Sequence, residues 1–205
     1  MKLHWSPRSP FVRKVVIVMH ELGVAGRVDY VRSVVATTKP HRILMADNPL
    51  SKIPTLVLDN GEAIYDSPVI CEYLDLTFGS GKIVPQEPGR RIDALKRQAL
   101  GDGLLDLLLA WRGERMRPPE LQSSVHLESY AERLPAVLDR MSRDTAPAGG
   151  DRFDIGDIAT GCALSYLDFR FGDIDWRGGR EALRGWHERF VVRPSVIKTP
   201  VVDEP

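Results

Sequence analysis

The sequence has little cysteine and no long apolar run. Two cysteines, Cys71 and Cys162, occur in 205 residues, far apart and with neither CxxC nor zinc-ligand spacing. This argues against a disulfide framework and favours a reducing compartment. No window approaches the roughly 18 apolar residues that a membrane-spanning helix needs, and the start, MKLHWSPRSP, has no apolar core of a secretory signal. We therefore expect a soluble, cytoplasmic protein with no membrane partner.

Net charge is also absent, since 28 Lys and Arg residues balance 28 Asp and Glu residues. A neutral balance argues against a general nucleic-acid partner. The histidines show no metal-ligand spacing, so no metal is expected; they are His4, His20, His41, His126 and His187. With 43% hydrophobic and 27% charged residues, the chain has the composition of a globular protein with a sizeable core.

The first 80 residues alternate between strand and helix patterns. Strands are predicted over 2–5, 27–32, 55–58 and 62–65, and helices over 10–22, 41–47 and 68–77. Pro10 and Pro68 each stand at the first position of a helix, where proline is favoured. The sequence Asp59-Asn60-Gly61 predicts a tight turn between the last two strands. The resulting order is β-α-β-α-β-β-α, in which only the parallel pairs need crossover helices.

The rest of the chain shows no strand pattern. Residues 79–89 are rich in Gly and Pro and predict a linker. Helices are predicted over 90–117, over 121–143 with Pro135 as the site of a kink, over 155–171 and over 179–191, with a loop at 146–151 and an irregular last dozen residues. The expected architecture is an α/β domain at 1–78, a linker at 79–89 and an all-α domain at 90–205.

Four strings along the chain resemble motifs of the glutathione S-transferase family. They are SPFVRKV at 9–15, NPLSKIPTL at 48–56, DSPVICEYL at 66–74 and FDIGDIA at 153–159. The second resembles the family's NPxGKVPxL loop, with Ser51 where glycine is usual, and SPFVRK is typical of a bacterial, serine-type subgroup. The resemblance runs to about residue 190. It implies a thioredoxin-like domain that binds glutathione, a C-terminal helical-bundle domain and a homodimer.

Glutathione chemistry requires a thiolate, and an unperturbed thiol has a pKa near 8.5. A hydroxyl hydrogen bond and the positive end of a helix both lower such a pKa. Ser9 offers both because it precedes the helix that Pro10 opens, and the resemblance places the catalytic Ser or Cys here. Ser6, at the end of the first strand, is the alternative, and Ser9 also suits a plain helix cap. Serine at position 9 argues against reductase chemistry through a mixed disulfide.

The resemblance assigns the second and third motifs to glutathione binding. It implies a cis Ile53-Pro54 bond, which presents the N–H and C=O of Ile53 to the cysteinyl part of glutathione. Lys52 is placed to reach a ligand carboxylate. The structural alternatives are an ordinary turn proline and a solvated lysine.

Asp66 and Ser67 precede Pro68, which makes Ser67 the expected N-cap of the third helix. The resemblance implies that the free N–H groups at this helix start, with the Ser67 hydroxyl, bind the γ-glutamyl carboxylate. It also implies that Asp66 pairs with the ligand's α-amino group. Helix capping alone is the structural alternative.

Several other residues have structural interpretations. Asp154 and Asp157 have the spacing of a capping box, so we expect a folding role and no catalysis. Arg13 is expected to act structurally or electrostatically, and both cysteines to be buried apolar groups. Four aromatic residues either line a second-substrate pocket or belong to the core: Trp5, Trp111, Tyr166 and Phe169.

The resemblance implies an enzyme that activates glutathione for attack on a small, hydrophobic electrophile, as in detoxification. Isomerisation, dehalogenation, ether cleavage and peroxide reduction are related alternatives. A non-catalytic binding or scaffold protein with the same fold is the alternative of another class. The sequence favours the enzyme because all the glutathione-contacting side chains are present: Ser9, Lys52, Pro54, Asp66 and Ser67. The electrophile itself is left open.

Overall fold

The computed structural model describes residues 1–36, 38–145 and 152–203, so the loop predicted at 146–151 lies outside the described residues. The predicted fold class is confirmed: a thioredoxin-like domain is followed by a helical domain. Internal contacts form two compact units, one of Met1–Pro88 with the segment from Pro194 onward, the other of Gly89–Arg193. In the described part of the chain, no helix is long and apolar enough to cross a membrane.

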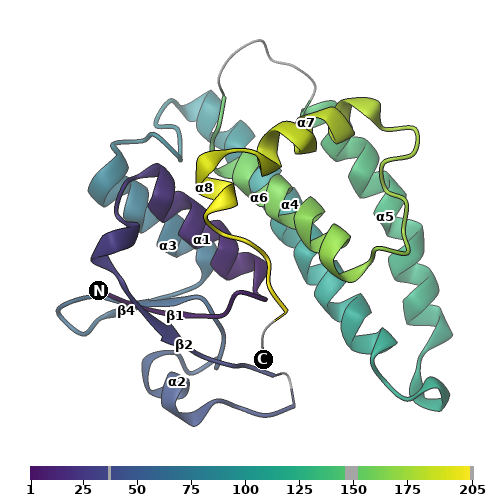
Figure 1. Cartoon of the computed structure of the whole chain (residues 1–205), viewed down its shortest axis with the longest axis horizontal. Coiled ribbons are helices and arrows are strands. Elements are labelled where there is room, and N and C mark those ends of the chain that lie inside the picture. The colour runs from purple at the N-terminus through teal and green to yellow at the C-terminus, as the bar shows by residue number, and fades with distance from the viewer. Residues whose placement is uncertain (37, 146–151, 204–205) are drawn as a thin grey trace. The chain divides into compact units, whose positions relative to one another are not determined.

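The first unit contains a four-stranded sheet in the order β2-β1-β3-β4. Its elements are β1 (Lys2–Trp5), α1 (Pro10–Glu21), the 3-10 turn η1 (Ala25–Arg27), β2 (Asp29–Arg32), α2 (Arg42–Asp47), β3 (Thr55–Val57), β4 (Ala63–Ile64), α3 (Ser67–Leu74), the π-helical turn η2 (Asp75–Gly79) and α8 (Pro194–Ile197). Strand β1 pairs in parallel with β2 and antiparallel with β3, which pairs antiparallel with β4. Helices α1 and α3 cover one face of the sheet and α2 covers the other (Figure 1).

Strand β1 is buried on both faces. Leu3 and His4 are adjacent and both almost fully buried, although successive side chains of a strand point to opposite faces. Leu3 pairs with Leu56 of β3 in the apolar core. On the other side His4 bonds Asp47 of α2, with 2.8 Å between Nε2 and Oδ2. Helices on both faces of the sheet explain why this strand lacks the apolar–polar alternation of a half-exposed one.

The predicted linker is folded onto the first unit. The α-helix predicted over 68–77 ends at Leu74 and continues as η2, and the carboxylate of Asp75 accepts bonds from the N–H groups of Ile83 (3.0 Å) and Val84 (2.8 Å). Ile83 and Val84 are buried. The unit therefore extends to Pro88, beyond the boundary expected at residue 78.

The C-terminal segment belongs by its contacts to the first unit, whereas the sequence assigned 90–205 to the helical domain. Its described part begins with α8, where an irregular tail was expected, and runs past α1 (Figure 1). The Nε of Arg13 donates to the carbonyl of Thr199 at 2.9 Å, and Arg8 pairs with Asp203 at 3.1 Å. Arg13 thus has a structural role, as expected.

The second unit is helical throughout its described elements. These are α4 (Pro88–Arg115), the 3-10 turn η3 (Pro119–Leu121), α5 (Ser124–Asp144), α6 (Ile155–Arg170) and α7 (Glu181–Val191). Helix α6 is buried along nearly its whole length and forms the core. Gly101 of α4 allows close packing, because a Cβ there would lie 2.7 Å from the backbone carbon of Ala159. Helix α5 continues through Pro135.

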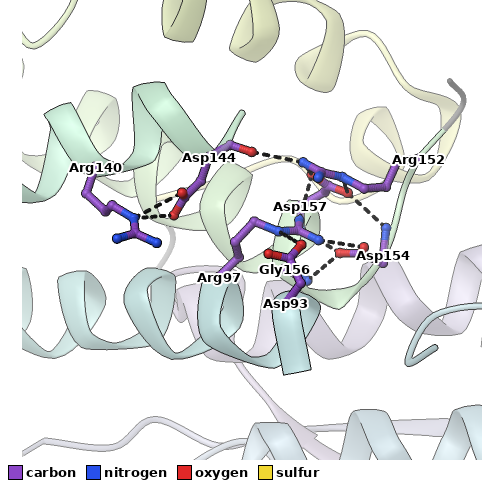
Figure 2. A network of polar contacts seen from close by, with 8 residues as sticks. All are labelled: Asp93, Arg97, Arg140, Asp144, Arg152, Asp154, Gly156 and Asp157. Carbon is purple, nitrogen blue, oxygen red and sulfur yellow. Dashed lines mark hydrogen bonds and ion pairs between the residues drawn. The ribbon is translucent and has the colours of Figure 1, made fainter. Parts of the chain in front are cut away.

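The capping box expected at Asp154 and Asp157 is confirmed (Figure 2). The Asp154 carboxylate accepts from the N–H of Asp157 at 3.3 Å, and the Asp157 carboxylate accepts from that of Asp154 at 3.1 Å. Buried Arg97 of α4 bonds Asp154 at 2.7 Å and Asp157 at 3.1 Å. Burial, followed by the nearby charge of Asp154, raises the pKa of Asp157. These carboxylates are fully engaged in structure, as a folding role requires.

Candidate functional site

Three segments singled out by the sequence meet at one edge of the sheet. Because β1 and β3 are antiparallel and His4 pairs with Thr55, the end of β1 lies beside the start of β3. Leu56 pairs with Ile64, so the end of β4 lies at the same edge. The loop after β1 leads to Ser9, the loop before β3 carries Ile53 and Pro54, and β4 leads to Ser67. The strand pairing thus brings Ser9 to the same edge as two motifs that lie more than 40 residues later in the sequence.

Ser9 is the N-cap of α1, and its half-buried hydroxyl accepts from the N–H of Val12 at 3.3 Å. The other candidate, Ser6, is buried at the end of β1 and accepts from the N–H of Arg8 at 3.4 Å. The two serines are linked through the backbone, since the N–H of Ser9 donates to the carbonyl of Ser6 at 3.1 Å. Of the two, only Ser9 stands at the positive end of a helix.

The loop before β3 holds Ile53 and Pro54 buried, with the Ile53–Pro54 bond in the cis form that the resemblance implies. Ile53 packs in a cluster with Val12 of α1 and Leu44 of α2. Lys52 is exposed, and within the described residues no carboxylate forms an ion pair with its ammonium group. The loop therefore presents a buried backbone turn beside an accessible cation.

Asn48 braces this loop, a role that the sequence interpretation missed. Its buried amide donates to the carbonyl of Lys52 at 3.2 Å and to the hydroxyl of Thr55 at 2.9 Å. Its side-chain oxygen accepts from the N–H of Leu50 at 3.0 Å. The signal available in the sequence was Asn48-Pro49, which was interpreted as a turn alone.

The start of α3 differs from the expectation. Asp66, and not Ser67, is the N-cap, and Ser67 is the first helical residue, with Pro68 second. Asp66 is exposed, whereas Ser67 is 2% exposed. The side chain of Asp66 makes no capping hydrogen bond to α3. The N-cap side chain thus leaves the first N–H groups of the helix uncapped, which suits this helix start to bind a carboxylate.

A Ser–His–Asp chain elsewhere in this unit lacks the access that a nucleophile needs. His4 Nδ1 lies 2.8 Å from the hydroxyl of Ser33, and His4 Nε2 lies 2.8 Å from Asp47. Hydrogen bonds from Lys2 and then from His4 lower the pKa of Asp47. Ser33 and His4 are each 1% exposed, and the Ser33 hydroxyl also donates to the carbonyl of Val31 at 3.3 Å. The chain therefore ties β1 to α2 and is structural.

The remaining candidates fall into structural positions. Both cysteines are buried, as expected. Among the described residues, no group of three or more His, Cys, Asp and Glu side chains is placed to hold a metal. Tyr166 is buried in the helical core, and Trp111 lines a cavity of about 580 Å³ within the helical unit. Trp5 lines a groove in the first unit.

Comparison with known proteins agrees with this geometry. The family models for the glutathione S-transferase N-terminal and C-terminal domains match residues 8–77 and 124–189. The chain is 31% identical over 204 residues to the uncharacterized GST-like protein YibF of Escherichia coli (strain K12), with 97% of this chain and 98% of the relative covered.

Two solved structures extend the likeness. A glutathione transferase family member from Pseudomonas fluorescens Pf-5, with bound glutathione, is 35% identical with a TM-score of 0.92 over 98% of each chain. A glutathione S-transferase from Methylobacillus flagellatus KT, with GSH bound, is 34% identical with a TM-score of 0.86, over 98% of this chain and 99% of that one. The protein described here therefore belongs to the glutathione S-transferase family.

Proposed function

We propose that this protein binds reduced glutathione at the shared sheet edge and activates its thiol for attack on a small, hydrophobic electrophile. The observation that carries the proposal is the meeting of Ser9, Ile53–Pro54 and the uncapped start of α3 at that edge. The glutathione bound in relatives of 35% and 34% identity supports it.

Ser9 is the proposed activating residue. A serine hydroxyl has one donor proton and two acceptor lone pairs. The bond from the N–H of Val12 uses an acceptor, so the proton is available for the glutathione sulfur. The donated hydrogen bond and the positive end of the 12-residue helix α1 both stabilise a thiolate. Ser6 is the alternative donor.

The rest of glutathione is matched by the other two segments. The backbone of Ile53 pairs with the cysteinyl portion, as in strand addition. The γ-glutamyl carboxylate takes the free N–H groups at the start of α3 and the hydroxyl of Ser67. The exposed carboxylate of Asp66 pairs with the α-amino group, and Lys52 pairs with the second ligand carboxylate.

Broader features of the proposal follow from the family. We place the chain in the bacterial, serine-type subgroup on the string SPFVRK at 9–14. A homodimer, a cytoplasmic location and a role in detoxification fit this assignment. In this proposal the thioredoxin-like domain binds glutathione and the helical domain binds the electrophile.

Calorimetric titration with reduced glutathione tests the binding site. Replacing Ser67 with alanine removes a hydrogen bond to a charged group, so the affinity should fall about tenfold. Saturable binding of the wild type that Ser67→Ala weakens would support the site. No binding at millimolar glutathione would refute the proposal.

Thiolate absorbance of the bound glutathione tests activation. Ser9→Ala should remove this absorbance, and Ser123→Ala is the matched control, because Ser123 caps α5 of the helical unit by accepting from the N–H of His126. Both variants lose a helix cap, so only a specific role for Ser9 separates them. Absorbance that survives in Ser9→Ala but disappears in Ser6→Ala would transfer the role to Ser6.

A glutathione-binding protein without catalysis is the second candidate. One observation favours it: the hydrogen bond that Ser9 makes to Val12 is a helix cap, which a non-enzyme needs as well. Normal glutathione affinity with no thiolate signal in the wild type would select this candidate.

A further inference from the structure

A cavity of about 580 Å³ lies within the helical unit, between the end of α4, helix α5 and the segment that joins α6 to α7. Its volume is in the range of small-molecule sites. Figure 1 shows the connecting segment beside α5, and Arg180 of this segment pairs with Asp139 of α5 at 2.7 Å. None of the described residues that line the cavity belongs to the first unit. A ligand in this cavity therefore contacts neither Ser9 nor the loop before β3.

Aromatic and aliphatic side chains form most of the cavity wall. The aromatic part consists of Trp111 of α4 and Trp176 of the connecting segment. The indole of Trp111 packs against Phe171 with ring centroids 5.2 Å apart, and the indole of Trp176 donates to Asp168 at 2.7 Å. Aliphatic residues complete the wall: Leu127, Leu134, Leu138 and Ile174. Both indoles are held in place by these contacts, so the wall suits a flat aromatic body.

Pro135 of α5 leaves a hydrogen-bond acceptor at this cavity. In an α-helix the carbonyl of residue 131 accepts from the N–H of residue 135, and proline has no N–H. The carbonyl of Ala131 therefore lacks its usual helical bond. Ala131 and Pro135 lie about one turn apart on one face of α5, and both line the cavity. A donor on a ligand can take the place of the missing N–H.

The other polar side chains of the lining are acceptors or are already paired. Gln122 uses the hydrogens of its amide on two backbone carbonyls, at 3.2 and 2.8 Å, which leaves its side-chain oxygen to accept. Arg115 bonds Asp173 through two nitrogens, at 3.3 and 2.8 Å, and Arg180 is paired as described above. Asp175 accepts from two backbone N–H groups of its own turn, both at 3.1 Å. Positive and negative charges are thus balanced and engaged, so the cavity favours an uncharged ligand that carries a hydrogen-bond donor.

We propose that this cavity is a second small-molecule site, which binds an uncharged aromatic alcohol such as a naphthol. Its ring packs against Trp111 and Trp176, and its hydroxyl donates to the carbonyl of Ala131. The proposal is independent of glutathione activation, because no group of the first unit takes part in it.

Calorimetric titration of the full chain with 2-naphthol tests the proposal. We expect saturable binding that is about fivefold tighter than that of 2-methoxynaphthalene, which keeps the ring system but has no donor. The titration is repeated with saturating S-hexylglutathione, whose alkyl group occupies the space beside the glutathione sulfur. The affinity for 2-naphthol should be unchanged in its presence.

A substitution at Pro135 tests the hydrogen bond. Pro135→Ala restores the N–H that bonds the carbonyl of Ala131, and alanine is a better helix former than proline. The variant should therefore lose the fivefold preference for 2-naphthol over 2-methoxynaphthalene without losing stability. Pro119→Ala is the matched control, because Pro119 is an exposed proline of the same unit outside the cavity lining, and it should keep the preference.

A substitution at Ala131 locates the ligand. Ala131 is an exposed residue of α5 at the edge of the cavity, so Ala131→Trp adds bulk there and should weaken both compounds at least tenfold. Ala136→Trp is the matched control, because Ala136 is exposed on the same helix and does not line the cavity. It should leave both affinities unchanged.

Four results would each overturn the proposal. One is the absence of saturable binding at millimolar 2-naphthol. Another is displacement of 2-naphthol by S-hexylglutathione, which would place it at the glutathione site or beside it. The third is equal affinity of the wild type and Ala131→Trp, which would place the ligand elsewhere on the protein. The fourth is a preference for 2-naphthol that survives in Pro135→Ala, which would exclude the carbonyl of Ala131 as its acceptor.

Discussion

Replacing Arg97 with methionine should destabilise the helical unit by about 3 kcal/mol near pH 8. Arg97 is 4% exposed, and its partners Asp154 and Asp157 are 6% and 1% exposed. Removing one partner of a buried ion pair costs about 3–5 kcal/mol, because a charge is left without compensation. Arg152 still bonds Asp157, at 3.2 and 3.3 Å, so we expect the lower end of this range.

The size of the defect should depend on pH. The pKa of Asp157 in the folded protein lies above its unfolded value, first because of burial and then because of Asp154, and Arg97 opposes this shift. A carboxyl with a raised folded pKa loses its contribution to stability as the pH rises from its unfolded value, about 4, through the folded one. Without Arg97 the pKa of Asp157 in the folded protein should be raised further. The defect of Arg97→Met should therefore be smaller near pH 4.5 than near pH 8.

Urea unfolding followed by circular dichroism measures both effects. Arg140→Met is the matched control, since Arg140 forms an exposed pair with Asp144 in the same region (Figure 2) and should barely change the unfolding midpoint. Adding Asp157→Asn to Arg97→Met should recover part of the loss near pH 8. Equal midpoints for Arg97→Met and Arg140→Met, or a defect that is the same at both pH values, would refute the reasoning.

Three further substitutions, at two positions, test the first unit by the same assay. The hydroxyl of Ser51 accepts from the N–H of His41 at 2.8 Å, so Ser51→Ala should lower the stability by about 1 kcal/mol for the lost bond. Ser51 also has a φ of 53°, which favours glycine, so the Ser51→Gly variant should be about 1 kcal/mol more stable than the Ser51→Ala variant. Equal stability of the two variants would contradict a backbone effect. Asp75→Ala leaves the buried N–H groups of Ile83 and Val84 without acceptors, so it should lower the free energy of unfolding by about 2 kcal/mol. An unchanged free energy of unfolding would contradict a stabilising role for these two bonds.

The element order was predictable because its signals are local. Proline marks the first turn of α1 and the start of α3, and a turn sequence precedes β4. Each of these signals affects the backbone only within a few residues. The N-cap of α3 was predicted wrongly. Pro68 predicted the N-cap at Ser67, whereas Ser67 is the first helical residue and Asp66 is the N-cap. Proline is accommodated at the second helical position as well, because neither N–H there has a partner within the helix.

The candidate site was predictable only as separate segments. The resemblance named Ser9, Ile53–Pro54 and Ser67, but their meeting at one edge depends on the antiparallel pairing of β1 with β3. Arg97 escaped the sequence interpretation because its partners Asp154 and Asp157 lie on another segment. Asn48 escaped it because a turn sequence does not show that its amide is buried and bonded within the loop. A buried polar residue looks the same in sequence as an exposed one until its hydrogen bonds are known.

The sequence by itself determined the order of the strands and of helices α1 to α7, the absence of a disulfide framework and the family resemblance, because propensity, caps and motif spacing act along the chain. It did not predict α8. The tertiary structure decided which elements that are far apart in sequence contact one another. It placed Ile83 and Val84 in the first unit through Asp75, and it returned the C-terminal segment to α1 through Arg13. Long-range burial and hydrogen bonding fix such contacts, and they leave no periodic signature in either partner.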